Sequence, residues 1–388
     1  MDQKDERILH TVVLVHAHPD DETLWTGGLI AQLARQGDTR IVVVTCTRGE
    51  RGEVITAPGT ATADKGWLFG NHAALADYRT GELNAALAAL GNGYPIEHYF
   101  LDELPLPDGA AAGELTTPQP SPCGPEGAQG LENQNTQSGN KVRYVDSGMR
   151  WLVEPSMERD DPEGGYADGQ VGPEGQTPAA RTSTGGIAEP DPAATDGFAV
   201  VPIEEPAARL ANLLYHLGEE ATAYLFAEDY VYDDIYPGMV VYTYEADGGY
   251  GHPDHIRAHQ VTHRAFREAG DRLLHGHRLE DLMAMMLNEV TPRPVPKKDV
   301  GFSVKLKPVL PQVLNAMRAY ASQVQNVTED VNKAEGRVGW FALSNGVPLP
   351  LKAKEYYRYA DVWLSENVAD QPTPSFCAES QNLDYTNR

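Results

Sequence analysis

The stretch TVVLVHAHPDDETLW (residues 11–25) joins an apolar run to a cluster of histidines and acids. Its first part is an unbroken valine-rich run, which is typical of a strand buried on both faces of a parallel sheet. The polar residues that follow include His18, Asp20 and Asp21. Ligands in open parallel sheets bind beyond the carboxyl ends of the strands. The stretch therefore predicts both a central strand and a functional site at its end.

The rest of the chain alternates strand-like and helix-like segments. Between 11–17 and a second valine-rich run at 40–46 lies a segment with helical apolar spacing that stops at Gly37. This alternation predicts an α/β fold, with a Rossmann-like, mostly parallel sheet and helices on both faces. Further strands are predicted at 98–101 and 239–245, and further helices at 77–90, 206–217 and 255–270.

One segment interrupts this alternation. Residues 104–200 are rich in Pro, Gly and acids, and too poor in large apolar residues to offset the entropy of ordering. We predict one domain over 1–368 that contains this flexible insertion and a smaller C-terminal region, followed by a loose tail at 369–388. The patch KVRYVDSGMRWLV (141–153) is expected to dock on the core. Deletion of 156–198 is expected to leave the fold intact.

The composition excludes several classes of partner. The chain has 31 basic and 56 acidic residues, a formal net charge of -25. Nucleic acids and anionic membranes need a basic surface, so we expect neither as a partner and expect a small-molecule substrate instead. Three cysteines without paired spacing predict no disulfide framework and a reducing cytosol. The N-terminus lacks the apolar core of a signal peptide, so a cytoplasmic location is predicted.

Two clusters have the residue types and spacing of a metal site. His18 and Asp21 form H-x-x-D on a turn after the first strand, and DGGYGHPDH (247–255) follows the predicted strand 239–245. Imidazole with carboxylate suits Zn²⁺ or Fe²⁺, whereas Ca²⁺ and Mg²⁺ prefer oxygen ligands. A site of His18, Asp21 and His255 would leave positions open for water and substrate, as catalytic sites do. Asp20 beside that water is the predicted general base.

Ordinary interpretations compete for single residues. A lone histidine near a strand end is usually a core or surface residue, and His16 and most of the others are interpreted that way. The loop TRGERGEV (47–54) follows the second strand and faces the same end of the sheet. Its position alone leaves substrate contact and a solvated, charge-balanced loop equally open.

Taken together, the motifs resemble a known family. AHPDDE (17–22) and GGYGHPDH (248–255) are similar to the signatures of the LmbE-like (PIG-L) zinc-dependent de-N-acetylases. Further matches follow in the expected order: TCTRGERGEV (45–54), YRTGEL (78–83), VDSGM (145–149) and FALSNG (341–346). The resemblance implies an LmbE-like fold, one Zn²⁺ per chain, and removal of acetate from an N-acetylglucosaminyl group. It is strongest to the members that act on N-acetylglucosaminyl-inositol in mycothiol biosynthesis.

The resemblance also implies residue roles. It places the metal ligands and the general base on the residues already named. It makes His252 the histidine on the oxyanion side, oriented and kept charged by Asp254, and Tyr250 a group that polarises the amide oxygen. Substrate contacts are implied for Arg79, Asp146 and, less directly, Glu53. The Pro/Gly-rich segments on both sides of DSGM are longer than in the family, which leaves the placement of Asp146 open.

Alternative functions have their own sequence marks. The mycothiol S-conjugate amidases share both signatures but usually have proline in place of Gly251, so GGYGHPDH favours the deacetylase. Another N-acetyl amino sugar is a further possible substrate. A non-catalytic, nucleotide-binding α/β protein would have a G-x-G-x-x-G turn after the first strand, and that turn is absent from the sequence.

Overall fold

The computed structural model describes residues 10–107, 144–153, 180–181, 187–190, 195–227, 238–276, 285–291 and 300–360. The predicted tail at 369–388 and most of the insertion at 104–200 lie outside these ranges, so the predicted flexibility of the insertion is not tested. No helix in the described ranges is long and apolar enough to cross a membrane.

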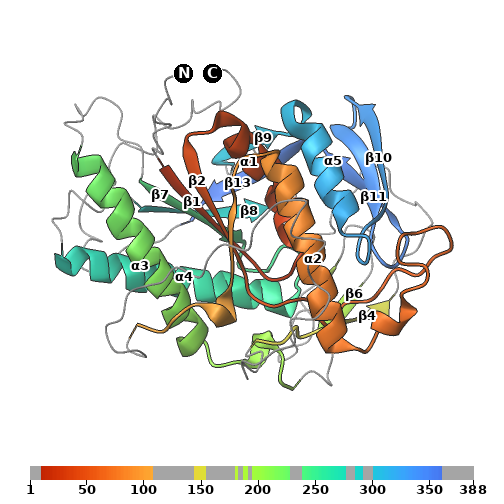
Figure 1. Cartoon of the computed structure of the whole chain (residues 1–388), viewed down its shortest axis with the longest axis horizontal. Coiled ribbons are helices and arrows are strands. Elements are labelled where there is room, and N and C mark those ends of the chain that lie inside the picture. The colour runs from red at the N-terminus through yellow and green to blue at the C-terminus, as the bar shows by residue number, and fades with distance from the viewer. Residues whose placement is uncertain are drawn as a thin grey trace.

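A seven-stranded sheet forms the centre of the molecule (Figure 1). Its strands β3, β2, β1, β7 and β8 run parallel to one another, whereas β13 is antiparallel to both β8 and β9. The predicted α/β fold with a mostly parallel sheet is therefore confirmed. In spatial order the strands are β3 (Glu97–Phe100), β2 (Thr39–Thr45), β1 (His10–His16), β7 (Met239–Tyr244), β8 (Met285–Thr291), β13 (Lys354–Tyr359) and β9 (Phe302–Lys305).

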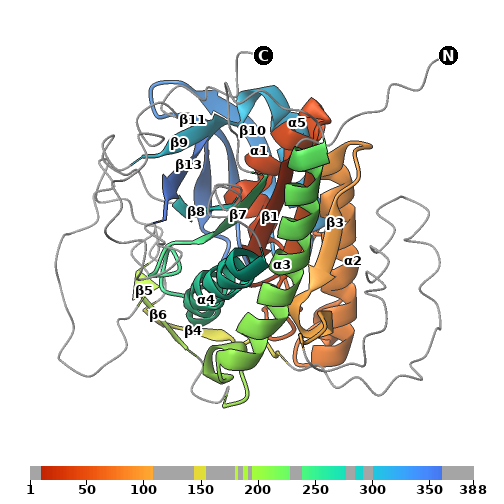
Figure 2. The ribbon, with the colours of Figure 1, turned by 90° about the vertical axis from the view of Figure 1, so that its left-hand side faces the viewer.

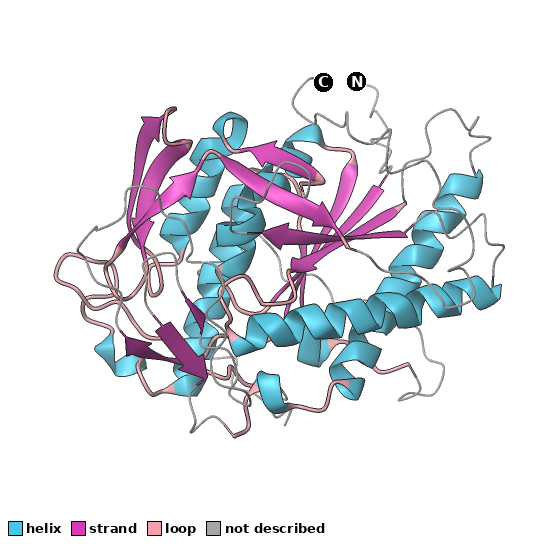
Figure 3. Ribbon diagram, turned by 180° about the vertical axis from the view of Figure 1, so that it is seen from behind, coloured by secondary structure: helices cyan, strands magenta, loops and turns pink. Residues whose placement is uncertain are grey.

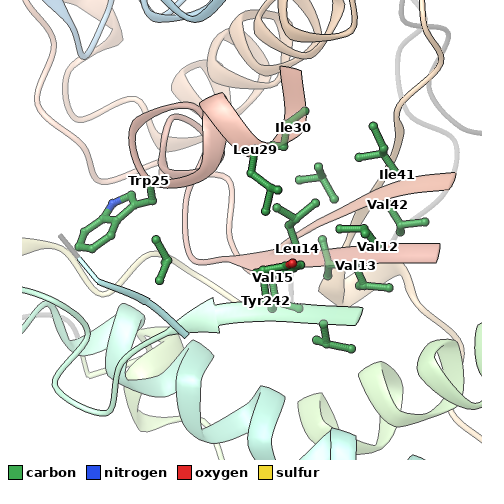
Figure 4. Packing of buried hydrophobic residues seen from close by; sticks show 14 of the residues in the cluster. Val12, Val13, Leu14, Val15, Trp25, Leu29, Ile30, Ile41, Val42 and Tyr242 are labelled. Atoms are coloured by element: carbon green, nitrogen blue, oxygen red, sulfur yellow. The ribbon is translucent and has the colours of Figure 1, made fainter. Parts of the chain in front are cut away.

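The strand β1 is central because both of its faces are apolar. Val13, Leu14 and Val15 are fully buried, and Figure 4 shows them packed among side chains from neighbouring elements. Fully burying such a side chain stabilises the fold by roughly 1.5–3 kcal/mol. The strands β1 and β2 pair without a register shift from His10↔Thr39 to His16↔Thr45, so they end level with each other. The turns that follow them therefore meet at one edge of the sheet.

Helices cover both faces of the sheet. The helices α1, α2 and α5 contact one another on one face, and α3 and α4 pack together on the other (Figure 2). Gly37, with φ 77°, ends α1 as predicted, while α4 continues past the expected stop at Gly270. The helices are α1 (Asp21–Gln36), α2 (His72–Gly91), α3 (Glu204–Ala227), α4 (Pro253–Gly276) and α5 (Leu310–Ala319).

A small second sheet lies in the C-terminal part of the described chain (Figure 3). It is antiparallel and consists of β10 (Gln325–Asn332), β11 (Arg337–Ala342) and β12 (Pro348–Lys352). Between it and α5, the backbone N–H and hydroxyl of Ser322 donate to the Glu82 carboxylate on α2, at 2.8 and 2.6 Å. The smaller C-terminal region predicted from the sequence is thus joined to the main domain by buried hydrogen bonds.

Part of the insertion lies within the described ranges. It contains a three-stranded sheet of β4 (Met149–Val153), β6 (Ile187–Pro190) and β5 (Ala180–Arg181). Tyr144 is 1% exposed, so the start of the patch that was expected to dock does so. Phe198, in a short 3-10 helix at Phe198–Val200, is 0% exposed and packs on Tyr144. Deletion of 156–198 stays a prediction, but it would remove the buried side chain of Phe198.

Candidate functional site

The turn after β1 is shaped by Asp20. Its φ of 110° is unusual for a residue other than glycine and marks a strained backbone. Its carbonyl oxygen accepts the N–H groups of Thr23 and Leu24, at 3.0 and 2.9 Å, and so starts α1. The Asp21 carboxylate turns back to accept the backbone N–H of His18 at 2.9 Å. The local geometry thereby fixes His18 and Asp21 side by side.

The turn after β7 depends on glycine. Gly248 has a φ of 65°, and a Cβ placed on it would lie 2.7 Å from Cβ of His255. Only glycine lets the turn approach the first turn of α4 this closely. The carbonyl oxygen of Gly248 lies 3.2 Å from Nδ1 of His255, which directs Nε2 of that ring toward the turn after β1.

These two turns converge on one carboxylate oxygen. Oδ2 of Asp21 lies 3.3 Å from Nδ1 of His18 and 3.3 Å from Nε2 of His255. All three residues are buried, and Nε2 of His255 has no hydrogen-bond partner among the described residues. Burial alone would raise the pKa of Asp21, but the imidazoles of His255 and His18 hold it well below its usual value. An ionised carboxylate and an unpartnered imidazole nitrogen fit a Zn²⁺ or Fe²⁺ ion.

A second group of acids faces the other edge of His18. Its Nε2 lies 3.1 Å from a carboxylate oxygen of Asp254 and 3.6 Å from Oδ1 of Asp146. Burial would lower the pKa of His18, but Asp146, Asp21 and Asp254 together raise it well above its usual value. Carboxylates that stabilise a charged imidazole would equally stabilise a bound cation.

The surroundings of His252 differ from the expectation. The structure brings His252 within reach of His18 and His255, with donor atoms of the three rings within 4.8 Å of one another. The Asp254 carboxylate, however, accepts the backbone N–H of Ser147 at 2.8 Å and its hydroxyl, rather than contacting His252. Only the backbone N–H of Asp254 reaches His252, donating to Nδ1 at 3.2 Å. Burial, with the nearby His18 and His255, lowers the pKa of His252 to about 3, a shift opposite to the one expected for an imidazolium.

Aromatic rings close the site on the α4 side. The ring of Tyr250 is half-buried, stacks on Trp25 at 6.1 Å and meets the His255 ring edge-on at 5.0 Å. Tyr244 stacks on His255 at 4.3 Å, and its hydroxyl accepts the backbone N–H of Ala17 at 2.9 Å. Sequence reasoning missed Trp25 and Tyr244. Both stand at the ends of recognised motifs, but an aromatic residue there is more often simply core.

Arg79 lies beneath Asp20 and is only 3% exposed. One terminal nitrogen donates to the carbonyl oxygen of Gly49 at 2.7 Å, and the other reaches the carbonyl oxygen of Pro19 and, at 3.2 Å, the Asp20 carboxylate. One terminal nitrogen therefore holds the turn that carries Asp20, and the other ties that turn to the loop after β2. The expected substrate contact is not what this geometry favours. Burial raises the pKa of Asp20 well above its usual value, although Arg79 opposes the shift.

The loop after β2 joins the insertion to the site. The guanidinium of Arg51 donates to the carbonyl oxygen of Asp146 at 2.7 Å, and its backbone N–H donates to the Asp146 carboxylate at 3.3 Å. Asp146 therefore reaches the site despite the long flanking segments. Glu53 is exposed, and its carbonyl oxygen accepts the side-chain amide of Gln323 at 2.7 Å. Glu50 is 4% exposed. Burial raises the pKa of its carboxyl group, and the nearby charge of Asp146 raises it further.

Comparison with known proteins places these residues in a family context. The family model of the PIG-L GlcNAc-PI de-N-acetylases matches residues 13–146. A protein of Saccharopolyspora erythraea named 1D-myo-inositol 2-acetamido-2-deoxy-alpha-D-glucopyranoside deacetylase 1 is 33% identical over 364 residues, which cover 89% of this chain and 88% of that protein. A protein of the same name without the final numeral, from Kineococcus radiotolerans, is 31% identical over 403 residues. The match covers 96% of this chain and 81% of that protein.

Solved structures match much more loosely. The 4-carboxy-2-hydroxymuconate hydratase of Pseudomonas putida KT2440 covers 80% of this chain and 79% of its own, at 16% identity and a TM-score of 0.38. The two deacetylases match this chain at more than 30% identity over most of its length. By that sequence identity, and by the family model that matches its N-terminal third, this chain belongs to the PIG-L family of de-N-acetylases.

Proposed function

We propose that the protein is a Zn²⁺-dependent hydrolase that removes acetate from the N-acetylglucosaminyl group of N-acetylglucosaminyl-inositol. The observation that carries the proposal is the convergence of His18 and His255, which are 237 residues apart in sequence, on Oδ2 of Asp21. These three residues would hold the cation. When bound, it supplies a Lewis acid that lowers the pKa of water and polarises a carbonyl.

Asp20 is the proposed general base. It follows His18 by two residues, and Arg79 holds its carboxylate at 3.2 Å. Because burial raises its pKa, Asp20 is a stronger base than an aspartate in water. It takes a proton from the attacking water and returns that proton to the departing amine. Since His252 is neutral here, Asp20 is the better proton donor of the two.

His252 and Tyr250 are the proposed hydrogen-bond donors to the oxyanion. Nδ1 of His252 accepts the backbone N–H of Asp254, so its proton is on Nε2 and available for donation. The Tyr250 hydroxyl belongs to a ring held between Trp25 and His255. Donors fixed before the reaction stabilise the developing charge without reorganisation, and losing one costs about 10²–10³ in turnover. Asp254 would act indirectly, by fixing His18 and Ser147.

The proposed substrate follows from the relatives, both of which are named for the inositol glycoside. Asp146 is the proposed acceptor for a sugar hydroxyl, because Arg51 and the backbone N–H of Gly148 fix its carboxylate beside His18. The exposed Glu53 is a more distant contact on the same loop.

The test is amine release by the purified, Zn²⁺-loaded protein from three substrates in parallel. These are N-acetylglucosaminyl-inositol, free N-acetylglucosamine and a mycothiol S-conjugate. We expect the highest kcat/KM for the inositol glycoside. Preference for the S-conjugate would make the protein an amidase of that class. Release from none of the three would refute the proposed substrate.

A further inference from the structure

A second cluster of metal-ligating side chains lies outside the site described above. It consists of His259 and His263 on α4 and Glu289 on β8, whose donor atoms lie within 4.8 Å of one another. Nε2 of His263 is 3.0 Å and Nδ1 of His259 is 3.6 Å from the same carboxylate oxygen, Oε1 of Glu289. The three side chains are 13%, 18% and 15% exposed for His259, His263 and Glu289. The cluster is therefore sheltered but open to ions from solvent.

The distances suit a common ion better than a single hydrogen bond. Zn²⁺ binds nitrogen and carboxylate oxygen at about 2.0–2.2 Å, which places tetrahedral ligand atoms about 3.3–3.5 Å apart. The observed 3.0 and 3.6 Å lie on either side of this spacing. A hydrogen bond explains the approach of His263 to Glu289. It does not explain the approach of His259, whose Nδ1 already lies 2.8 Å from the carbonyl oxygen of Tyr244.

The cluster is built on rigid elements. His259 and His263 are four residues apart on one helix, which puts their rings on the same face, and the ring centroids are 4.0 Å apart. Glu289 lies inside the sheet, paired with Thr243 on one side and Arg358 on the other. The guanidinium of Arg358 reaches Glu245, at 3.3 Å. No lysine or arginine in the described part of the chain forms an ion pair with Glu289, so its charge is available to a cation.

We propose that His259, His263 and Glu289 form a second binding site for a divalent transition-metal cation of the Zn²⁺ class, which fastens α4 to β8. On binding, Nδ1 of His259 gives up its proton and its hydrogen bond to the carbonyl oxygen of Tyr244, while Nε2 of the same ring takes up a proton from solvent, so the ring binds the cation as a neutral imidazole. Burial, together with the neighbouring His263, lowers the pKa of His259, so this ring is neutral and able to act as a ligand at neutral pH.

The second site lies one helical turn from the first. His255 precedes His259 by four residues on α4, and Tyr244 touches both, through its ring to His255 and its carbonyl oxygen to His259. A cation that joins α4 to β8 would therefore stabilise the helix that carries His255. We expect it to raise thermal stability, with little effect on turnover, because none of its ligands reaches the first site.

The test is the Zn²⁺ stoichiometry of the untagged protein, measured by elemental analysis after equilibrium dialysis against buffered Zn²⁺. We expect two equivalents in the wild type and one in both His263→Ala and Glu289→Gln, which keep deacetylation. His255→Ala should also bind one equivalent but lose deacetylation. His216→Ala is the matched control, because His216 lies near a single carboxylate, Glu219, at 3.8 Å, and should leave two equivalents.

Two results would overturn the second site. One is a single equivalent in the wild type that His255→Ala removes. The other is an unchanged stoichiometry in both His263→Ala and Glu289→Gln. Thermal unfolding separates loss of a ligand from misfolding: without metal, Glu289→Gln should melt near the wild type, and added Zn²⁺ should raise the melting temperature of the wild type more than that of the variant. An equal rise in both proteins would also contradict the proposal.

Discussion

At the scale of single residues, two adjacent acids have different proposed roles, one in binding metal and the other in moving protons. Asp20 and Asp21 are adjacent in sequence but face different partners. The carboxylate of Asp21 lies between two imidazole nitrogens, whereas that of Asp20 contacts Arg79. The two neighbouring carboxylates thus point to different partners, which makes Asp21 the proposed ligand and Asp20 the proposed base.

Asp20→Asn and His255→Ala should fail in different ways. Asp20→Asn should keep the metal of the first site and lose turnover by about 10²–10⁴, the usual contribution of a general base. His255→Ala should lose that metal, because only two ligands remain. Elemental analysis beside a kinetic assay distinguishes the two outcomes. Loss of metal in Asp20→Asn would instead make Asp20 a ligand.

Arg79 provides a second test at this scale. Arg79→Lys should lower kcat by about 10-fold or more and change KM by less than about 3-fold, because a lysine cannot hold two carbonyl oxygens and Asp20 at once. Arg35→Lys, at an exposed position on α1, is the control and should change neither constant. A raised KM with an unchanged kcat would show that Arg79 contacts the substrate, as the sequence resemblance implies.

At the scale of secondary-structure elements, a half-buried acid on β13 joins that strand to α1. Glu355 on β13 accepts the backbone N–H groups of Gly28 and Leu29, at 2.5 and 2.9 Å, and the hydroxyl of Tyr357 at 2.8 Å. Burial raises its pKa to about 7 despite these hydrogen bonds. Its protonation is therefore linked to the packing of α1 on the sheet.

This linkage predicts a pH dependence of stability. Because the folded pKa is above the unfolded value of about 4.5, the folded state holds the extra proton between these values. Stability should then fall as pH rises from about 4.5 to 7, by up to about 1.4 kcal/mol per pH unit from this group. Urea unfolding across this window should show a smaller fall in Glu355→Gln. Glu329→Gln, at an exposed position, should follow the wild type. Parallel curves for Glu355→Gln and wild type would contradict the linkage.

Phe198 tests whether the end of the insertion belongs to the core. Phe198→Ala should lower the free energy of unfolding by about 3–5 kcal/mol, because it empties a fully buried position. Val200→Ala, two residues away and at a position that is 59% exposed, should change it by less than about 0.5 kcal/mol. Equal effects of the two substitutions would mean that this segment is not part of the core.

At the scale of the whole molecule, the sequence was most informative where a pattern is local. Valine runs and helical spacing predicted β1, β2, β7 and the parallel sheet, since each pattern reports burial directly. The C-terminal strands were not predicted: β10 has six exposed or half-buried polar residues, and its pairing with β11 is set by long-range contacts. A polar, mostly exposed segment of this kind gives no burial pattern that distinguishes a strand from a loop.

The candidate site shows the same division. Spacing within HAHPDDE and GHPDH predicted which residues would meet, because each motif is one turn at a strand end. What each side chain contacts once there could not be predicted. The Asp254 carboxylate accepts a hydrogen bond from Ser147, which belongs to the insertion. The buried guanidinium of Arg79 contacts Asp20 and is not exposed to solvent. Such partners depend on how separate segments pack, and no spacing in one motif specifies that.

The metal dependence of the proposed reaction is tested by amine release from N-acetylglucosaminyl-inositol before and after removal of metal. The chelated protein should release no amine above background, and added Zn²⁺ should restore turnover to the wild type but not to His255→Ala. Full turnover by protein shown to be metal-free would contradict the account, since the convergence of His18, Asp21 and His255 would then serve some other purpose.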